Sequence, residues 1–82
     1  DFQAPLRLTL IHRNVPNMVG RMTEVLANYD LNIVNVVNRS NGDYAYTMID
    51  LDALEAKRLQ RIANKMAQIE NVVRVRVIEQ PK

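Results

Sequence analysis

The 82-residue sequence has no cysteine, no tryptophan, a single histidine and only two glycines. The lack of cysteine excludes disulfide bonds and thiolate metal sites, and one histidine is too few for a zinc site made by this chain alone. Gly20 and Gly42 lie far apart, so there is no glycine-rich loop of the kind that binds phosphate groups. We therefore expect this chain by itself to bind neither a metal nor a cofactor.

The sequence also has little net charge and no long hydrophobic run. Eleven Lys and Arg oppose nine Asp and Glu, giving a net charge of +2. Residues 57–65 hold the densest basic group, with the spacing of an exposed helix face. No apolar run is long enough to span a bilayer and no signal peptide is recognisable, so we expect a cytoplasmic protein without a membrane partner. Because the chain begins at Asp1 rather than at methionine, we expect it to be part of a longer protein.

Hydrophobic periodicity divides the chain into six elements. Strands are predicted where apolar and polar residues alternate or β-branched residues predominate: residues 6–12, 31–39, 44–52 and 72–79. Helices are predicted where apolar residues recur every three or four positions: Met18, Val19, Met22, Val25, Leu26 and Tyr29 in the first, and Leu59, Ile62, Met66 and Ile69 in the second.

Local signals mark where these elements begin and turn. Pro16 suits the first turn of the first helix, because that position needs no backbone donor. Asn41 and Gly42 lie between two predicted strands and indicate a tight hairpin. Asp52, followed three residues later by Glu55, resembles a capping box at the start of the second helix.

The resulting order is β-α-β-β-α-β, a pattern of the α+β class. The handedness rule and the single tight hairpin favour the ferredoxin-like fold, a four-stranded antiparallel sheet with two helices on one face. The strands 6–12 and 44–52 are then central, and the strands 31–39 and 72–79 lie at the edges.

The edge strand 31–39 is unusually apolar. Strict alternation places Val34 and Val36 on one face and Ile33 and Val37 on the other. An exposed apolar edge favours pairing with another strand. We therefore predict a homodimer formed edge to edge through this strand, with an extended eight-stranded sheet.

No set of residues indicates catalysis, because His12 has no carboxylate near it in the sequence. Nucleic-acid binding is the main alternative, since this fold also carries RNA-recognition modules that stack bases on central-strand aromatics. Tyr44 and Tyr46 follow Gly42 in a faint version of that pattern. The first strand has no aromatic residue, and the basic residues form no obvious stripe beside the tyrosines. We therefore expect no enzyme activity in this chain and no nucleic-acid partner.

His12 lies at the end of the first strand, and Asn14 lies in the loop that connects this strand to the first helix. His12 has the parity of the leucines that face the helices, and Asn14 lies close to a helix N-terminus, whose free N–H groups suit a carboxylate. An asparagine amide binds both an ammonium and a carboxylate. With Asn32 of a neighbouring chain, these residues form a candidate amino-acid site. The simpler interpretation is that Asn14 caps the helix, His12 is a satisfied strand-end residue and Asn32 belongs to a turn.

These residues resemble a known family. The stretches "RLTLIHRNVPNMVG", "LNIVNVVNRSNGDYAYTMIDLD" and "VRVRVI" are similar to an ACT domain, and most closely to the C-terminal regulatory domains of D-3-phosphoglycerate dehydrogenases. The likeness covers residues 6–78, so 1–5 is expected to be the end of a linker and 6–80 the regulatory domain. The His-x-Asn pair, followed by Asn32 eighteen residues later, is its most specific part.

The resemblance implies a function. The parent enzyme would oxidise 3-phosphoglycerate with NAD, bound by upstream domains, in the first committed step of serine synthesis. Its ACT domains pair through the second strand, and L-serine binds there as a feedback inhibitor. His12 and Asn14 would contact serine from one chain, with Val15 and Asn17 beside them, and Asn32 from the other chain.

One position departs from the family pattern. Serine-responsive domains commonly have glycine directly after the proline, where this chain has Asn17. Glycine permits close backbone approach to a ligand, whereas asparagine adds a side chain there. The alternatives are therefore an ACT-type dimerisation module that does not sense serine, or an RNA-binding ferredoxin-like domain.

Overall fold

The computed structural model describes residues 4–79. It contains four strands and two helices in these residues, in the predicted order: β1 (Leu6–Arg13), α1 (Met18–Ala27), β2 (Ile33–Asn41), β3 (Tyr44–Leu51), α2 (Ala56–Ala67) and β4 (Val72–Glu79). Of the predicted linker, residues 1–3 lie outside the described residues, as does residue 80 of the predicted domain, whereas Ala4 is buried. No helix within residues 4–79 has the length and apolar character needed to cross a membrane.

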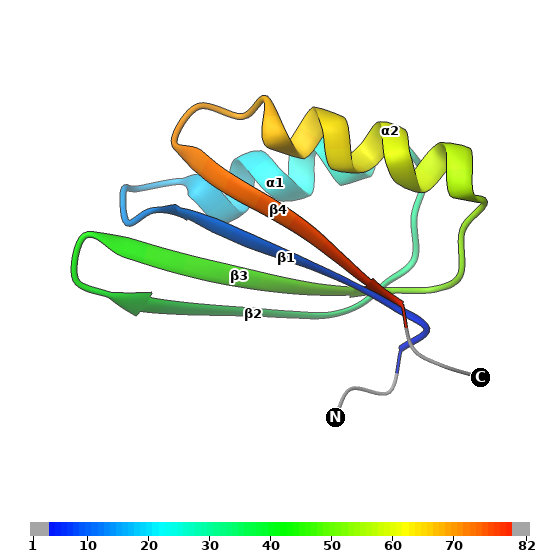
Figure 1. Ribbon diagram of the computed structural model, residues 1–82, viewed down its shortest axis with the longest axis horizontal. Helices are drawn as coiled ribbons and strands as arrows, with labels where there is room; N and C mark the ends of the chain where they lie inside the picture. The colour runs from blue at the N-terminus through cyan, green and yellow to red at the C-terminus, as the bar shows by residue number, and fades with distance from the viewer. Residues whose placement is uncertain (1–3, 80–82) are drawn as a thin grey trace.

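The four strands form one antiparallel sheet in the order β2-β3-β1-β4. Both helices cover the same face of this sheet, and no other element of residues 4–79 lies over the opposite face, which we call the uncovered face (Figure 1). The predicted ferredoxin-like fold, with β1 and β3 central and β2 and β4 at the edges, is confirmed.

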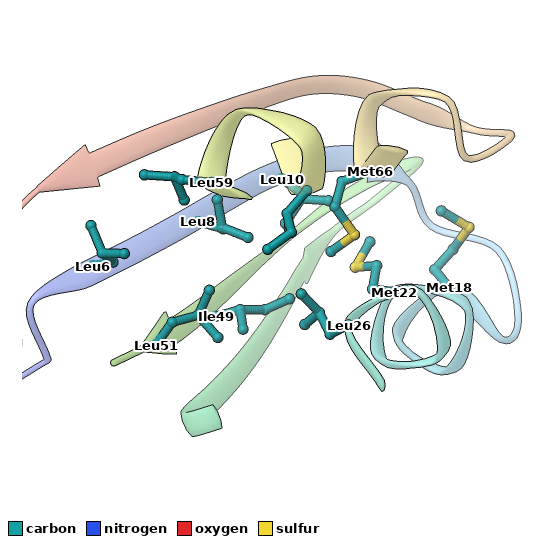
Figure 2. Packing of buried hydrophobic residues seen from close by; sticks show 11 residues of the cluster. Leu6, Leu8, Leu10, Met18, Met22, Leu26, Ile49, Leu51, Leu59 and Met66 are labelled. Carbon is teal, nitrogen blue, oxygen red and sulfur yellow. The ribbon is translucent and has the colours of Figure 1, made fainter. Parts of the chain in front are cut away.

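The hydrophobic core lies between the sheet and the helices. Alternate residues of β1, Leu6, Leu8 and Leu10, are buried, as the period of a half-buried strand requires. Met22 of α1 and Met66 of α2 point toward each other in the same core (Figure 2), and neither is exposed. The flexible methionine side chains fill the space where the two helices meet the sheet.

The apolar faces of β2 are not as alternation predicts. A bulge interrupts the pairing with β3, so that Ile33 lies opposite Leu51 and Asn35 opposite Asp50, with Val34 left between them. A bulge adds one residue and shifts the alternation that follows it. Ile33 and Val36 therefore both pack against the core, whereas Val34 is 50% exposed. The predictions that Val34 and Val36 share one face of the strand, and Ile33 and Val37 the other, are therefore wrong.

The two helix starts also differ from the sequence predictions. Helix α1 begins at Met18, with Asn17 at the N-cap position, so Pro16 lies in the turn before the helix rather than in its first turn. Helix α2 begins at Ala56 with Glu55 at the N-cap position and no side-chain capping bond. Asp52 is thus not the cap, because the helix begins four residues further on.

The predicted hairpin is present between β2 and β3. Asn41 pairs with Tyr44, so the two connecting residues are Gly42 and Asp43. Gly42 has a φ of 71°, a backbone conformation that glycine adopts without steric cost. This turn has a further role, because it contacts the segment between β1 and α1.

Candidate functional site

The segment that joins β1 to α1 is held against the β2–β3 turn by Asn14. The Asn14 side-chain amide donates to the Gly42 carbonyl at 3.0 Å, and its backbone N–H donates to the Asp43 carbonyl at 2.8 Å. The simpler interpretation, that Asn14 caps the helix, is therefore wrong. Its amide oxygen lies on an exposed residue, where it is available as an acceptor.

His12 lies beneath this segment and is 2% exposed. Its Nε2 is 2.9 Å from Oγ1 of Thr47 on β3, and its Nδ1 donates to the Arg13 carbonyl at 2.9 Å. The same carbonyl accepts the Val15 backbone N–H at 2.9 Å. The imidazole thus fixes the start of the connecting segment from below, and its predicted contact with a ligand stays a prediction.

Thr47 extends this contact to the edge of the sheet. Its hydroxyl donates to the Asn38 side-chain oxygen at 2.9 Å, and Asn38 belongs to β2. Reversing the Asn38 amide gives a second satisfied arrangement, in which Thr47 donates to Nε2. His12, Thr47 and Asn38 therefore form a hydrogen-bond relay from the connecting segment to the edge strand.

The N-terminus of α1 offers unused backbone donors. The first turn of a helix has N–H groups without intrahelical acceptors, and α1 has no acidic residue there. Asn17 makes no side-chain capping bond and has a φ of 68°, in the left-handed region that asparagine tolerates. Its Oδ1 lies 2.5 Å from where a Cβ on Gly20 would be. The Asn17 side chain thus lies over the first turn of the helix, in space that Gly20 leaves open.

Asn32 lies at the other end of the sheet. Its side-chain amide donates to Oδ2 of Asp52 at 2.5 Å, and its carbonyl accepts the Asp52 backbone N–H at 3.3 Å. Both residues are exposed. Asn32 precedes the first residue of β2, whereas Asn14 contacts the turn that follows its last residue, so about 25 Å of strand separates them. One chain alone therefore does not bring Asn14 and Asn32 together.

The structure adds residues that the sequence analysis missed. Thr47 and Asn38 were not expected near His12, because they lie on strands distant from it in the sequence. The sequence predicts a helix-capping role for Asp52, whereas in the structure its carboxylate accepts a hydrogen bond from Asn32. Sequence alternation alone points to Thr47, which lies on the buried face of β3 between Ala45 and Ile49.

A single ion pair is formed within residues 4–79, on the uncovered face of the sheet. Arg7 Nε donates to Oδ1 of Asp50 at 2.7 Å, and Nη2 donates to Oδ2 at 3.1 Å. The hydrogen bond to Asp50 raises the pKa of Arg7, with desolvation opposing and charge attraction adding to this effect. The same residues contain no group of three or more side chains suited to a metal ion.

The sequence matches curated proteins over nearly its whole length. D-3-phosphoglycerate dehydrogenases 1 and 2 of Saccharomyces cerevisiae are 27% and 30% identical to it over 78 residues, which is 95% of this chain. The match covers 16% of each of these enzymes, so the chain spans about a sixth of their length.

The fold also matches solved structures. The ACT domain from GTP pyrophosphokinase of Chlorobium tepidum superposes with a TM-score of 0.78 at 15% identity, over 89% of this chain and 95% of that one. At this identity the likeness shows the fold alone. The family model described as "ACT domain" matches residues 1–76, which is nearly the whole sequence. The chain therefore belongs to the ACT domain family.

Proposed function

We propose that the chain is the C-terminal regulatory domain of a D-3-phosphoglycerate dehydrogenase and that it binds L-serine between two copies of itself. The similarity to the two yeast dehydrogenases supports the parent enzyme. In this proposal the rest of the enzyme carries the catalytic residues and the NAD site. The domain supplies feedback inhibition in serine synthesis.

Two features at the start of α1 suit an amino acid. The free N–H groups of the first turn favour a carboxylate, because the helix dipole adds a partial positive charge there. Asn14, four residues before this helix, is exposed, and its amide oxygen can accept a hydrogen bond from an ammonium group. In this proposal Val15 and Asn17 line the rest of the serine site. His12 positions the segment between β1 and α1 through its hydrogen bond to the Arg13 carbonyl.

The observation that carries the proposal is the placement of Asn14 and Asn32 at opposite ends of β2. An antiparallel dimer that pairs β2 with β2 about its central residue, Val37, places the first residue of one strand opposite the last residue of the other. Asn32 of the partner subunit then lies opposite Gly42, whose carbonyl binds Asn14. A two-fold axis thus completes two identical sites from halves that one chain keeps apart.

Serine bound in such a site contacts both chains, so it binds the paired state more tightly than the separated state. By linkage it shifts the equilibrium toward the paired state and restrains the catalytic domains attached to it. The relay from His12 to Asn38 connects the ligand segment to the strand that forms the interface.

The experiment combines sedimentation with calorimetric titration by L-serine. We expect the domain to sediment as a dimer. Its titration with millimolar L-serine should release heat, whereas titration with D-serine should not. Asn32→Ala should abolish the heat of L-serine binding while the domain stays folded. Val34→Lys, in the β2 bulge, should weaken the dimer, because a charge on an edge strand opposes pairing.

Val73→Lys is the matched control. Val73 occupies the corresponding bulge of the other edge strand, β4, and is 61% exposed. A monomer at all concentrations, or equal effects of the two lysines, would contradict the β2 interface. A stable dimer that gives no heat with serine would instead identify a dimerisation module, consistent with Asn17 standing in place of glycine.

A further inference from the structure

The uncovered face of the sheet carries an excess of positive charge. The strand register places five arginines on it: Arg7, Arg13, Arg39, Arg74 and Arg76. Asp50 is the single carboxylate that the strands direct to this face, and it is bound by Arg7. Within the part of the chain described here, the other four arginines have no carboxylate within ion-pair distance. Since the whole chain has a net charge of +2, the rest of it is net negative.

Two tyrosines lie among these arginines. Tyr44 and Tyr46 of the central strand β3 are 47% and 43% exposed, and they lie about 7 Å apart along the strand. Arg13 pairs with Tyr44 across the sheet, with its guanidinium carbon 5.8 Å from the ring centre, and Arg39 pairs with Tyr46. The sequence prediction that no basic stripe lies beside the tyrosines is therefore wrong. It failed because the arginines come from three different strands.

A small hollow lies next to the tyrosines on the same face. It has a volume of about 100 Å³ and is lined by Thr9 and Ile11 of β1 and by Arg74 and Arg76 of β4. Two guanidinium groups at the rim of a hollow that also contains a hydroxyl suit a phosphate group, because arginine donates two parallel hydrogen bonds to it.

We propose that this face binds single-stranded RNA. Successive bases stack on Tyr44 and Tyr46, while Arg39 and the pair Arg74 and Arg76 contact the phosphates on either side. Exposed aromatic residues on a central strand of a four-stranded sheet are how RNA-recognition modules of this topology hold unstacked bases. The aromatic-small-aromatic run from Tyr44 to Tyr46 is similar to part of the sequence pattern that those modules carry.

Charge argues against a second copy as the occupant. Two such faces brought together would oppose four uncompensated arginines with four others, and like charges repel across an interface. An acidic protein surface would satisfy the arginines but gives no reason for two flat aromatic rings at the spacing of one strand repeat. The uncovered face is also distinct from the β2 edge, so RNA binding does not depend on the serine site.

The test is fluorescence anisotropy with a labelled mixed-sequence single-stranded RNA, titrated with the 82-residue domain at several salt concentrations. We expect saturable binding that weakens with salt. Tyr44→Ala and Tyr46→Ala should each weaken binding about tenfold, whereas Tyr46→Phe should retain it, because stacking needs the ring and not the hydroxyl. The Arg74→Ala/Arg76→Ala variant should reduce the salt slope by about 1.4, the value for two lost contacts to a single strand.

The matched control is Lys57→Ala/Arg61→Ala, which removes the same charge from the exposed face of α2. Equal weakening by the two double variants would reduce the binding to general charge attraction and overturn the proposal. So would the absence of binding at low salt, or tighter binding to a poly-glutamate peptide that does not depend on the tyrosines. Circular dichroism of each variant confirms that it is folded.

Discussion

Thr47→Val removes one hydroxyl from the buried relay and keeps the shape of the side chain. Thr47 is fully buried, and His12, which it contacts at 2.9 Å, is 2% exposed. Without the hydroxyl, Nε2 of His12 has no partner and no access to water. A buried polar group left unsatisfied costs about 1–3 kcal/mol. Asn38 adds little, because it is exposed and water replaces the lost bond.

We therefore expect Thr47→Val to reduce the free energy of unfolding by about 2 kcal/mol. For a domain of this size, that change lowers Tm by roughly 8–16 °C. The assay is urea and thermal unfolding followed by circular dichroism, at one fixed protein concentration because dimerisation would shift Tm.

Thr9→Val is the control for this prediction. Thr9 is half-buried on β1 but faces the uncovered side of the sheet, so the same substitution should change stability by less than about 0.5 kcal/mol. If the two variants were equally stable, His12 would have to find another partner, and the relay would not contribute to the fold.

Three further variants test two local contacts. Asn17→Gly/Gly20→Ala should raise the free energy of unfolding by about 1 kcal/mol, since alanine favours a helix over glycine. Gly20→Ala alone should raise it by less, because the new Cβ would lie 2.5 Å from Oδ1 of Asn17. Equal increases for the two variants in urea unfolding would refute this contact. Arg7→Met should cost about 3 kcal/mol, because it leaves the Asp50 carboxylate buried without its partner. Since Asp50 raises the pKa of Arg7, the guanidinium stays charged through the neutral and moderately alkaline range, and its stabilisation is lost only in strongly alkaline solution. The difference in free energy of unfolding between the unsubstituted domain and Arg7→Met should therefore be the same at about pH 7 and about pH 10. A large decrease over that range would contradict a stabilising role for the ion pair.

The sequence by itself determined the order of the elements, the layer architecture and the positions of the edge strands. These follow from local patterns: the alternation of Leu6, Leu8 and Leu10, the helical spacing of Met18 and Met22, and the hairpin signal at Gly42. It also located His12 at the end of a strand and Asn14 in the segment between that strand and the first helix.

Only the tertiary structure decided which side chains meet. The register of β1 and β3 brings His12 to Thr47, 35 residues away, and shows that the imidazole is enclosed. The bulge at Val34 reverses the alternation of β2, because one extra residue turns every later side chain to the opposite face. Arginines scattered over three strands gather around two tyrosines for the same reason: strand pairing, rather than sequence separation, sets which residues are neighbours.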